Sequence, residues 1–163
     1  MIRVKHVIFS PKQAPNAQLA PNPVASADAT CPAGYKAFFV FGTSRRATTT
    51  AFKVENSIDW VIQPYTYYYN SEEKPVWLTD SVALLGVRNG NFTTLENRIA
   101  GYIAYVASGL NADYTTLATD NCQSWTALGY NMSYGLAGET SSRFITDATV
   151  ECSNEVWFYC VEQ

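Results

Sequence analysis

Three stretches near the end of the sequence decide the fold: Asp120-Asn121-Cys122-Gln123-Ser124-Trp125, then Glu151-Cys152, and finally Val156-Trp157-Phe158-Tyr159-Cys160-Val161. They contain three of the four cysteines, and the fourth is Cys31. The apolar run that leads to Cys160 is typical of a buried strand. Because a strand at the end of the sequence needs a partner far back in the chain, we expect a disulfide from this region to Cys31.

The four cysteines allow three pairings. An extended segment from Cys152 to Cys160 would span about 26 Å, whereas the Cα atoms of a disulfide lie about 5.5 Å apart. That bridge would need a hairpin, against which the apolar run from Val156 argues. Two pairings remain sterically open: Cys31 with Cys160 and Cys122 with Cys152, or Cys31 with Cys152 and Cys122 with Cys160. We predict the first, nested pairing, whose long and short bridges would stabilise by about 5 and about 3.7 kcal/mol on a loop-entropy model.

Six stretches, taken in order along the chain, carry a resemblance to a known family. They are Val7–Ser10, Ser26–Cys31, Gly34–Val40 with Gly42–Arg45, Ile58–Pro64 with Tyr67–Tyr69, Gly109–Tyr114, and Asp120–Gln163. Together they resemble the leptospiral endostatin-like proteins, a bacterial family of domains of unknown function known from surface lipoproteins. The resemblance covers most of the chain except about residues 71–100.

The resemblance implies a C-type-lectin-like (endostatin-like) α+β fold. Such a domain has an antiparallel sheet, one or two short helices, long loops, and a short cysteine pair nested inside a pair that joins an early helix to the last strand. The nested pairing is therefore also the one that the resemblance implies. It further implies that the first strand lies near the last, so that the two termini are close together.

The composition is that of one globular domain spanning residues 1–163. Hydrophobic residues make up 47% and charged residues 15% of the 163 residues, which is unlike a disordered chain. The net charge of −3 gives no argument for binding to nucleic acid or an anionic membrane. The resemblance allows Arg45, Arg46 and Lys53 to form a basic patch for sulfated glycans, but we favour scattered solvated charges. No apolar run reaches the length of a transmembrane span or a signal peptide.

The cysteines set the expected compartment. Disulfides form and persist in oxidising surroundings, so we expect an extracellular protein or one at the outer cell surface. Met1 would then begin a mature or trimmed domain from which an export signal has been removed.

Local patterns predict the remaining elements. Strands are expected at Arg3–Phe9, Tyr35–Phe41, Ile58–Ile62, Val82–Val87, Ile99–Val106, Phe144–Ile145 and Val156–Val161. A Pro/Ala/Asn-rich loop at 11–25 should lead into a helix with Ser26 as its N-cap. Thr43–Glu55 is the candidate for a second helix, although its β-branched threonines disfavour one. Residues 65–80 should form a long loop with short strands, residues 88–91 a turn, and the Gly-rich segment 129–141 a loop.

Aromatic residues mark the expected binding surface, because Tyr and Trp are rigid amphipathic anchors at interfaces. Alternation along 65–69 would place Tyr65, Tyr67 and Tyr69 on one face and Tyr68 on the other. Some of these tyrosines can instead pack in the core, and Trp60, Trp125 and Trp157 are assigned mainly to the core. The candidate ligand-binding residues are Tyr65, Tyr67, Tyr68, Tyr69, Trp77, Tyr130 and Tyr134.

The sequence contains no convincing motif for a catalytic site or a metal site. Gln63-Pro64-Tyr65 has a phenol where a calcium-binding lectin loop has an acid, and calcium needs several oxygen ligands. His6 is the only histidine, which leaves neither a zinc cluster nor a Ser–His or Cys–His pair. The acidic pair Glu72-Glu73 beside Lys74 indicates a solvated loop rather than a glycosidase pair. We therefore expect no enzyme, no metal and no cofactor.

Three functions remain open. The resemblance implies an exported bacterial adhesion domain that binds host or neighbouring macromolecules, such as matrix proteins or complement regulators, through segments 65–77 and 127–142. A structural subunit of a filament, sheath or pilus-like assembly would instead be a homo-oligomer with a large exposed apolar patch. A calcium-independent carbohydrate-binding module would stack sugar rings on Tyr and Trp. Each would meet a protein or glycan ligand outside the cell.

Overall fold

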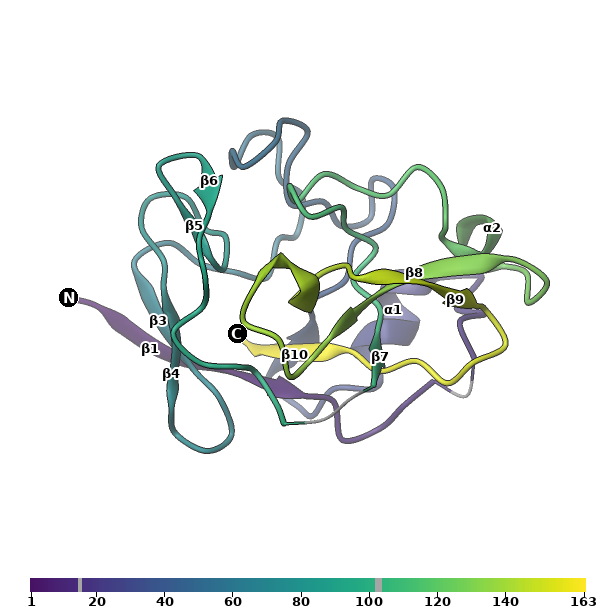
Figure 1. Cartoon of the computed structure of the whole chain (residues 1–163), viewed down its shortest axis with the longest axis horizontal. Helices are drawn as coiled ribbons and strands as arrows, with labels where there is room; N and C mark the ends of the chain where they lie inside the picture. Colours follow the sequence, from purple (N-terminus) through teal and green to yellow (C-terminus); the bar gives the residue numbers. More distant parts are fainter. Residues whose placement is uncertain (15, 102–103) are drawn as a thin grey trace.

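The computed structural model describes residues 1–14, 16–101 and 104–163 of the chain. Within them the chain has an α+β fold of short strands, two short helices and long loops (Figure 1). The strands form a five-stranded sheet of order β2-β10-β1-β3-β4, a three-stranded sheet of order β7-β8-β9, and the hairpin β5-β6.

The five-stranded sheet is built around the first strand. Its strands are β1 (Arg3–Phe9), β2 (Tyr35–Ala37), β3 (Thr66–Tyr69), β4 (Pro75–Leu78) and β10 (Tyr159–Glu162). β1 pairs with β10 antiparallel, Val7 opposite Val161, so the first strand lies beside the last as expected. β1 pairs with β3 in parallel, Val4 opposite Tyr67. The β1–β3 pair departs from the expected antiparallel sheet, because the long segment between the two strands allows the chain to return in the same direction, whereas the other pairs of this sheet are antiparallel.

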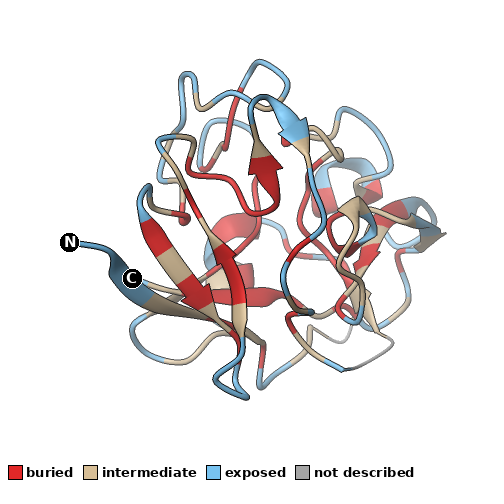
Figure 2. Ribbon diagram, turned by 60° about the vertical axis from the view of Figure 1, so that its left-hand side comes forward, coloured by how far each residue is buried: buried red, intermediate tan, exposed pale blue. Residues whose placement is uncertain are grey.

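The buried residues lie in the interior of the molecule (Figure 2) and form two hydrophobic clusters. One lies under the five-stranded sheet and includes Val7, Phe38, Tyr68 and Tyr159. The other surrounds Trp125 at the opposite end of the molecule. Phe38 belongs to the first cluster and its neighbour Phe39 to the second, and both are fully buried. Consecutive residues of an extended chain point to opposite sides, so this segment joins the two clusters.

The structure pairs the cysteines in the nested arrangement. Cys31 is bonded to Cys160, with Cα atoms 5.6 Å apart, and this bridge spans 129 residues. Cys122 is bonded to Cys152, with Cα atoms 5.7 Å apart, across 30 residues. The first bridge ties the segment after α1 (Pro23–Asp28) to β10. The second links α2 (Cys122–Trp125) to the residue that follows β9 (Ala148–Glu151).

The three-stranded sheet occupies a region predicted largely as loop. It consists of β7 (Tyr105–Val106), β8 (Asn131–Leu136) and β9 (Ala148–Glu151). β8 lies in the Gly-rich segment, where Gly135 is required because a Cβ there would collide with the carbonyl oxygen of Phe144. Glycine in a strand can thus mark a close approach of two backbones rather than a loop.

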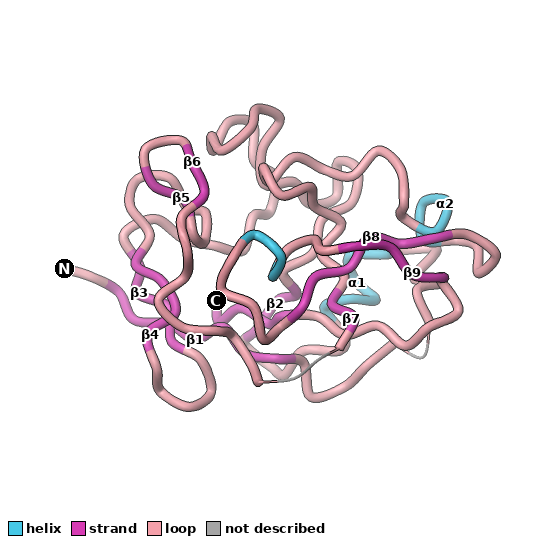
Figure 3. Tube along the Cα trace, viewed as in Figure 1, coloured by secondary structure: helices cyan, strands magenta, loops and turns pink. Residues whose placement is uncertain are grey.

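The helices also differ from the prediction (Figure 3). Helix α1 spans Pro23–Asp28, and its N-cap is Asn22, not Ser26, because the Asn22 side chain accepts a hydrogen bond from the Ala25 N–H. Pro23 at the first helical position suits this start. Helix α2 (Cys122–Trp125) is a single turn in which all four residues have positive φ. Phe144 lies in the 3-10 helix η1 (Ser142–Phe144), not in a strand.

The predicted helix Thr43–Glu55 is absent, and turns with isolated bridges take its place. Thr48 Oγ1 donates to the Thr50 carbonyl and accepts from the Thr50 N–H. Such local side-chain bonds compete with helix formation. The bridge between Arg46 and Ile58 folds the segment back on itself.

Several predicted strands are shorter than expected. The strand from Tyr35 ends at Ala37, and only Ile58 of Ile58–Ile62 makes a bridge. β5 (Val87–Arg88) and β6 (Asn91–Phe92) form a hairpin across the predicted turn, where Asn89 and Gly90 have the positive φ that such turns need. Of Ile99–Val106, residues 102–103 lie outside the described residues and only Tyr105–Val106 is strand.

Arg45 is buried, contrary to the prediction of a solvated charge. Its side chain is 1% exposed and binds Asp28 through two bonds of 2.8 and 2.9 Å. It also binds the Asp59 carboxylate at 2.7 Å and the Ala37 carbonyl at 3.0 Å. Lys36 approaches Asp59 from the surface at 2.5 Å. Arg45 therefore joins α1, β2 and the segment before β3.

Candidate functional site

The seven predicted binding residues lie in three places. Tyr65, Tyr67 and Tyr69 lie at the start of β3 and on its outer side, whereas Tyr68 and Trp77 face the core. Tyr130 and Tyr134 belong to the turn before β8 and to β8 itself, at the opposite end of the molecule (Figure 1). They therefore do not form one continuous surface.

Tyr68 and Trp77 are core residues. Tyr68 is fully buried, its hydroxyl accepts from the Gln63 N–H at 2.9 Å, and burial raises its pKa to about 12. Trp77 is 6% exposed, and the Arg88 guanidinium lies 4.8 Å from its ring centre. Their side chains are directed inward by the alternation of paired strands, so we leave both out of the candidate surface.

The outer side of β1 and β3 carries the strongest surface feature. Ile2, Val4 and Tyr65 are 56%, 62% and 59% exposed. Val4 lies opposite Tyr67 in the parallel register, and the rings of Tyr67 and Tyr69 are 5.1 Å apart. We call the surface of Ile2, Val4, Tyr65, Tyr67 and Tyr69 the β1–β3 face.

Two contacts hold the tyrosines of this face in place. The Tyr67 hydroxyl donates to Glu96 Oε2 at 2.7 Å, and this bond raises the pKa of Tyr67 to about 12. The Tyr69 ring packs against that of Tyr67. Because their rotamers are already fixed, little side-chain entropy is lost when a ligand covers them.

His6 borders this face and connects three segments. Its Nδ1 lies 2.9 Å from Glu162 of β10, and its Nε2 lies 3.1 Å from Glu73 in the turn between β3 and β4. The hydrogen bond to Glu162 raises the pKa of His6, with a further contribution from Glu73 and in spite of partial burial. The same hydrogen bond lowers the pKa of Glu162. The sequence did not reveal this cluster, because the partners are 156 and 67 residues from His6.

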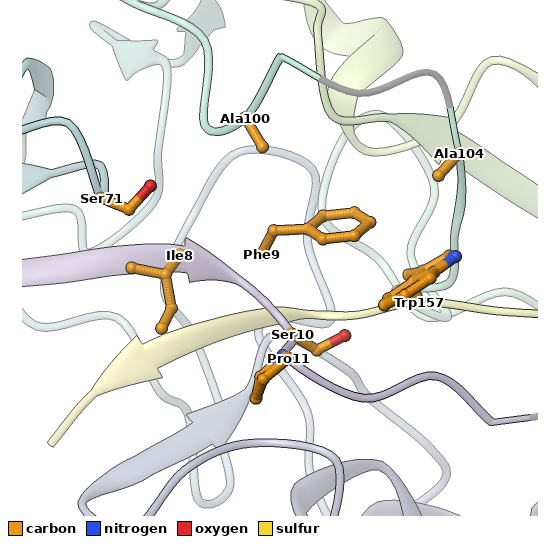
Figure 4. A pocket seen from close by; sticks show the side chains of 8 residues that line it. All are labelled: Ile8, Phe9, Ser10, Pro11, Ser71, Ala100, Ala104 and Trp157. Atoms are coloured by element: carbon orange, nitrogen blue, oxygen red, sulfur yellow. The ribbon is translucent and has the colours of Figure 1, made fainter.

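A groove opens where the five-stranded sheet meets the three-stranded sheet (Figure 4). Its first hollow, about 610 Å³, is lined mainly by Ile8, Phe9, Pro11 and Trp157, with Ala100, Ala104 and the hydroxyls of Ser10 and Ser71. The Phe9 and Trp157 rings are 4.8 Å apart. Trp157, assigned mainly to the core from the sequence, is half-buried and forms one wall.

A second hollow of about 430 Å³ continues the groove. It shares Ala104 and Trp157 with the first and adds Tyr105, Asn154 and Glu155. We call the two together the Trp157 groove. Phe9, Tyr105 and Glu155 were not among the predicted site residues, because they come from the end of β1, the start of β7 and the loop before β10, which only the tertiary fold brings together.

The hollow at the opposite end of the molecule is lined mainly by polar residues. Tyr130 is 51% exposed and lines a hollow with Asp120, Asn121 and Asn131. The α2 turn beside it has the left-handed backbone that costs about 1–2 kcal/mol per residue, and the Cys122 disulfide and the Asn121 cap hold it there. Tyr134 packs against Tyr105, with ring centres 4.7 Å apart.

The described parts of the chain contain no group of three or more His, Cys, Asp or Glu side chains placed to hold a metal ion. None of the helices in those parts is long and apolar enough to span a bilayer. Two disulfides and no free cysteine are consistent with a protein that folds outside the cytoplasm.

Comparison with known proteins identifies the family of the chain. No curated protein is similar to the chain. Residues 17–143 match the family described as "Protein of unknown function (DUF1554)". This match covers most of the sequence and includes α1, the buried Arg45, the β3–β4 hairpin and β8. The chain therefore belongs to the DUF1554 family.

Proposed function

We propose that this chain is a non-catalytic adhesion domain that works outside the cytoplasm and binds a protein ligand through the β1–β3 face. The observation that carries the proposal is the grouping of Ile2, Val4 and Tyr65, each more than half exposed, beside the ordered pair of Tyr67 and Tyr69. Exposed apolar and aromatic side chains gathered on one surface commonly mark an interaction site.

The finer assignment is to the leptospiral endostatin-like proteins and their C-type-lectin-like fold. Three features support it: the nested disulfides, the pairing of β1 with β10, and the order of the resembling stretches. On this assignment the source is bacterial, the protein is exported to the surface, and its ligands are matrix proteins, complement regulators or other neighbouring macromolecules.

The chemistry of the face favours a protein over a sugar. Ile2 and Val4 are aliphatic, and the Tyr67 hydroxyl is already bonded to Glu96. A sugar needs several polar partners, whereas a protein surface can cover aliphatic and aromatic groups together.

The test is binding of the purified, oxidised domain to immobilised matrix and complement proteins. The double variant Val4→Ser, Tyr65→Ser should weaken binding at least about tenfold, because it removes exposed anchors without touching the core. The matched control is Leu128→Ser, Tyr130→Ser, which removes exposed apolar groups at the other end of the molecule. Loss of binding in the control but not in the face variant would move the site and refute the proposal.

The same exposed patch also suits self-association, which keeps the structural-subunit alternative open. Light scattering on the oxidised domain across a concentration series separates the two. A monomer at every concentration supports the adhesion domain. A defined oligomer that Val4→Ser, Tyr65→Ser dissolves would assign the face to contacts between copies of this chain.

A further inference from the structure

We propose that the Trp157 groove is a second binding site, distinct from the β1–β3 face, and that it takes a peptide segment in which an apolar side chain neighbours a lysine or arginine. The groove has two compartments of different chemistry that meet at Trp157. The inference does not depend on the function proposed for the β1–β3 face.

The first compartment suits an apolar side chain. Ile8, Phe9, Pro11 and Trp157 form most of its lining, and its volume of about 610 Å³ exceeds that of any single side chain. Ligand pockets of this kind are mostly apolar and largely preformed.

Backbone hydrogen bonds fix the walls of the groove. The Ser10 N–H donates to the Phe158 carbonyl at 2.9 Å, and the Trp157 N–H donates to the Tyr105 carbonyl at 2.9 Å. Ser10 Oγ accepts from the Phe158 N–H at 3.2 Å. Because these two sides of the groove belong to a backbone ladder, a ligand would not have to order them.

The second compartment suits a cation. Glu155 is exposed and makes no hydrogen bond or ion pair with the residues that the structure describes. It lines the hollow with the aromatic rings of Tyr105 and Trp157, and none of the described residues that line either compartment is a Lys or Arg. An unpaired carboxylate beside aromatic rings attracts an ammonium or guanidinium group through charge and cation–π interaction.

The two compartments share Trp157 and Ala104, so one ligand must supply both groups from adjacent positions. Neighbouring residues of a peptide meet this condition. A neutral sugar fits less well, because the described lining of the first compartment is mainly apolar and the second compartment holds a carboxylate that a neutral sugar leaves unpaired.

The probe is acetyl-Leu-Arg-amide, titrated into the oxidised ¹⁵N-labelled domain and followed by NMR. We expect the amide signals of Phe9, Tyr105 and Trp157 and the Trp157 indole N–H to shift. Acetyl-Leu-Gln-amide should bind about three- to tenfold more weakly, since it lacks the cation. Equal binding of the two peptides, shifts that map elsewhere, or shifts with methyl glucoside and not with peptide would overturn the proposal.

Exposed substitutions provide the variants, which avoids loss of folding. Glu155→Gln should weaken acetyl-Leu-Arg-amide to the level of acetyl-Leu-Gln-amide, and Glu155→Lys should reverse the preference toward acetyl-Leu-Glu-amide. Glu151→Gln, which removes an exposed acid outside the lining of the groove, is the control and should change nothing.

These experiments test the two proposed binding sites separately. Val4→Ser, Tyr65→Ser should leave peptide binding in the groove unchanged. If peptide binding is lost in that variant but kept in Glu155→Gln, the groove is not the site. If matrix-protein binding fails while the peptide binds, the proposed adhesion function falls and the groove stands.

Discussion

Two charged clusters in this protein have the same arrangement. In each, a basic side chain lies between two carboxylates that come from distant segments. Arg45 binds Asp28 and Asp59, and His6 binds Glu162 and Glu73. They differ in the burial of the cation, because the Arg45 side chain is 1% exposed whereas the His6 side chain is 28% exposed. The buried Arg45 cluster is therefore expected to stabilise the fold at every accessible pH. The His6 cluster at the surface should stabilise it only while the imidazole is protonated.

The physical reason lies in solvation and in the cation. A buried guanidinium stays charged at all accessible pH values and loses its hydration, so its partners become indispensable. A half-buried imidazole keeps part of its hydration and can gain or lose its proton, and the hydrogen bond to Glu162 raises the pKa of His6. Three experiments test this contrast.

The largest effect is expected from Arg45→Met. Removal of one partner of a buried ion pair leaves uncompensated carboxylates and costs about 3–5 kcal/mol, measurable by urea unfolding with the disulfides intact. The control is Arg46→Met, because among the described residues the Arg46 guanidinium binds the Asn56 carbonyl alone. If the two variants unfold at the same urea concentration, the buried ion pairs of Arg45 do not stabilise the fold. Adding Asp28→Asn and Asp59→Asn to Arg45→Met should restore part of the stability.

A smaller, pH-dependent effect is expected from His6→Gln. The pKa of His6 is raised in the folded state by its hydrogen bond to Glu162, above an ordinary value of about 6.5. A raised pKa contributes stability that is fully present below the unfolded value and is lost as pH rises through the folded value. The pKa of Glu162 is lowered, so its own contribution is lost at the acid end.

The measurement is the free energy of unfolding at pH 5.5 and at pH 9, for the wild type and for His6→Gln. The wild type should be more stable at the lower pH by about 0.5–1 kcal/mol relative to the variant, and the difference should vanish at the higher pH. Lys5 and the phenol of Tyr35 also lie near this site. The pKa of Tyr35 is raised by burial, so it stays neutral over this range, and Lys5→Gln serves as the control. If the free energy of unfolding depends on pH in His6→Gln as it does in the wild type, the His6 ion pairs do not contribute to stability.

The smallest effect is expected from Lys74→Met. Lys74 pairs with Glu72 at 2.6 Å and lowers the pKa of that carboxyl, but both side chains are exposed. Water and salt screen such a pair, so we expect no change in the urea midpoint. A clear loss of stability would mean that burial is not what separates the two clusters.

Some features of the fold and site could be predicted because they depend on neighbours in the sequence. The alternation of Arg3–Phe9 determined β1, and the alternation of 65–69 correctly set Tyr68 apart from Tyr67 and Tyr69. Asn89 and Gly90 determined the hairpin turn. The sheet period of two is a local property, and the positive φ of a tight turn is one as well.

Other features could not be predicted because they depend on residues that meet only in the fold. Arg45 was taken as a surface charge, since nothing beside it in the sequence indicates that Asp28 and Asp59 will surround it. The strand β8 was missed because Gly135 signals a loop until the Phe144 backbone is known to lie against it.

The sequence by itself determined the first and last strands, the cysteine framework together with the family resemblance, and the wealth of aromatic residues. Only the tertiary structure decided which aromatic rings reach solvent, which charges are buried, and that Phe9, Tyr105 and Trp157 line one groove. The physical reason is that hydrophobic pattern and backbone preference act over a few residues, whereas burial and charge pairing arise between segments brought together by the whole core.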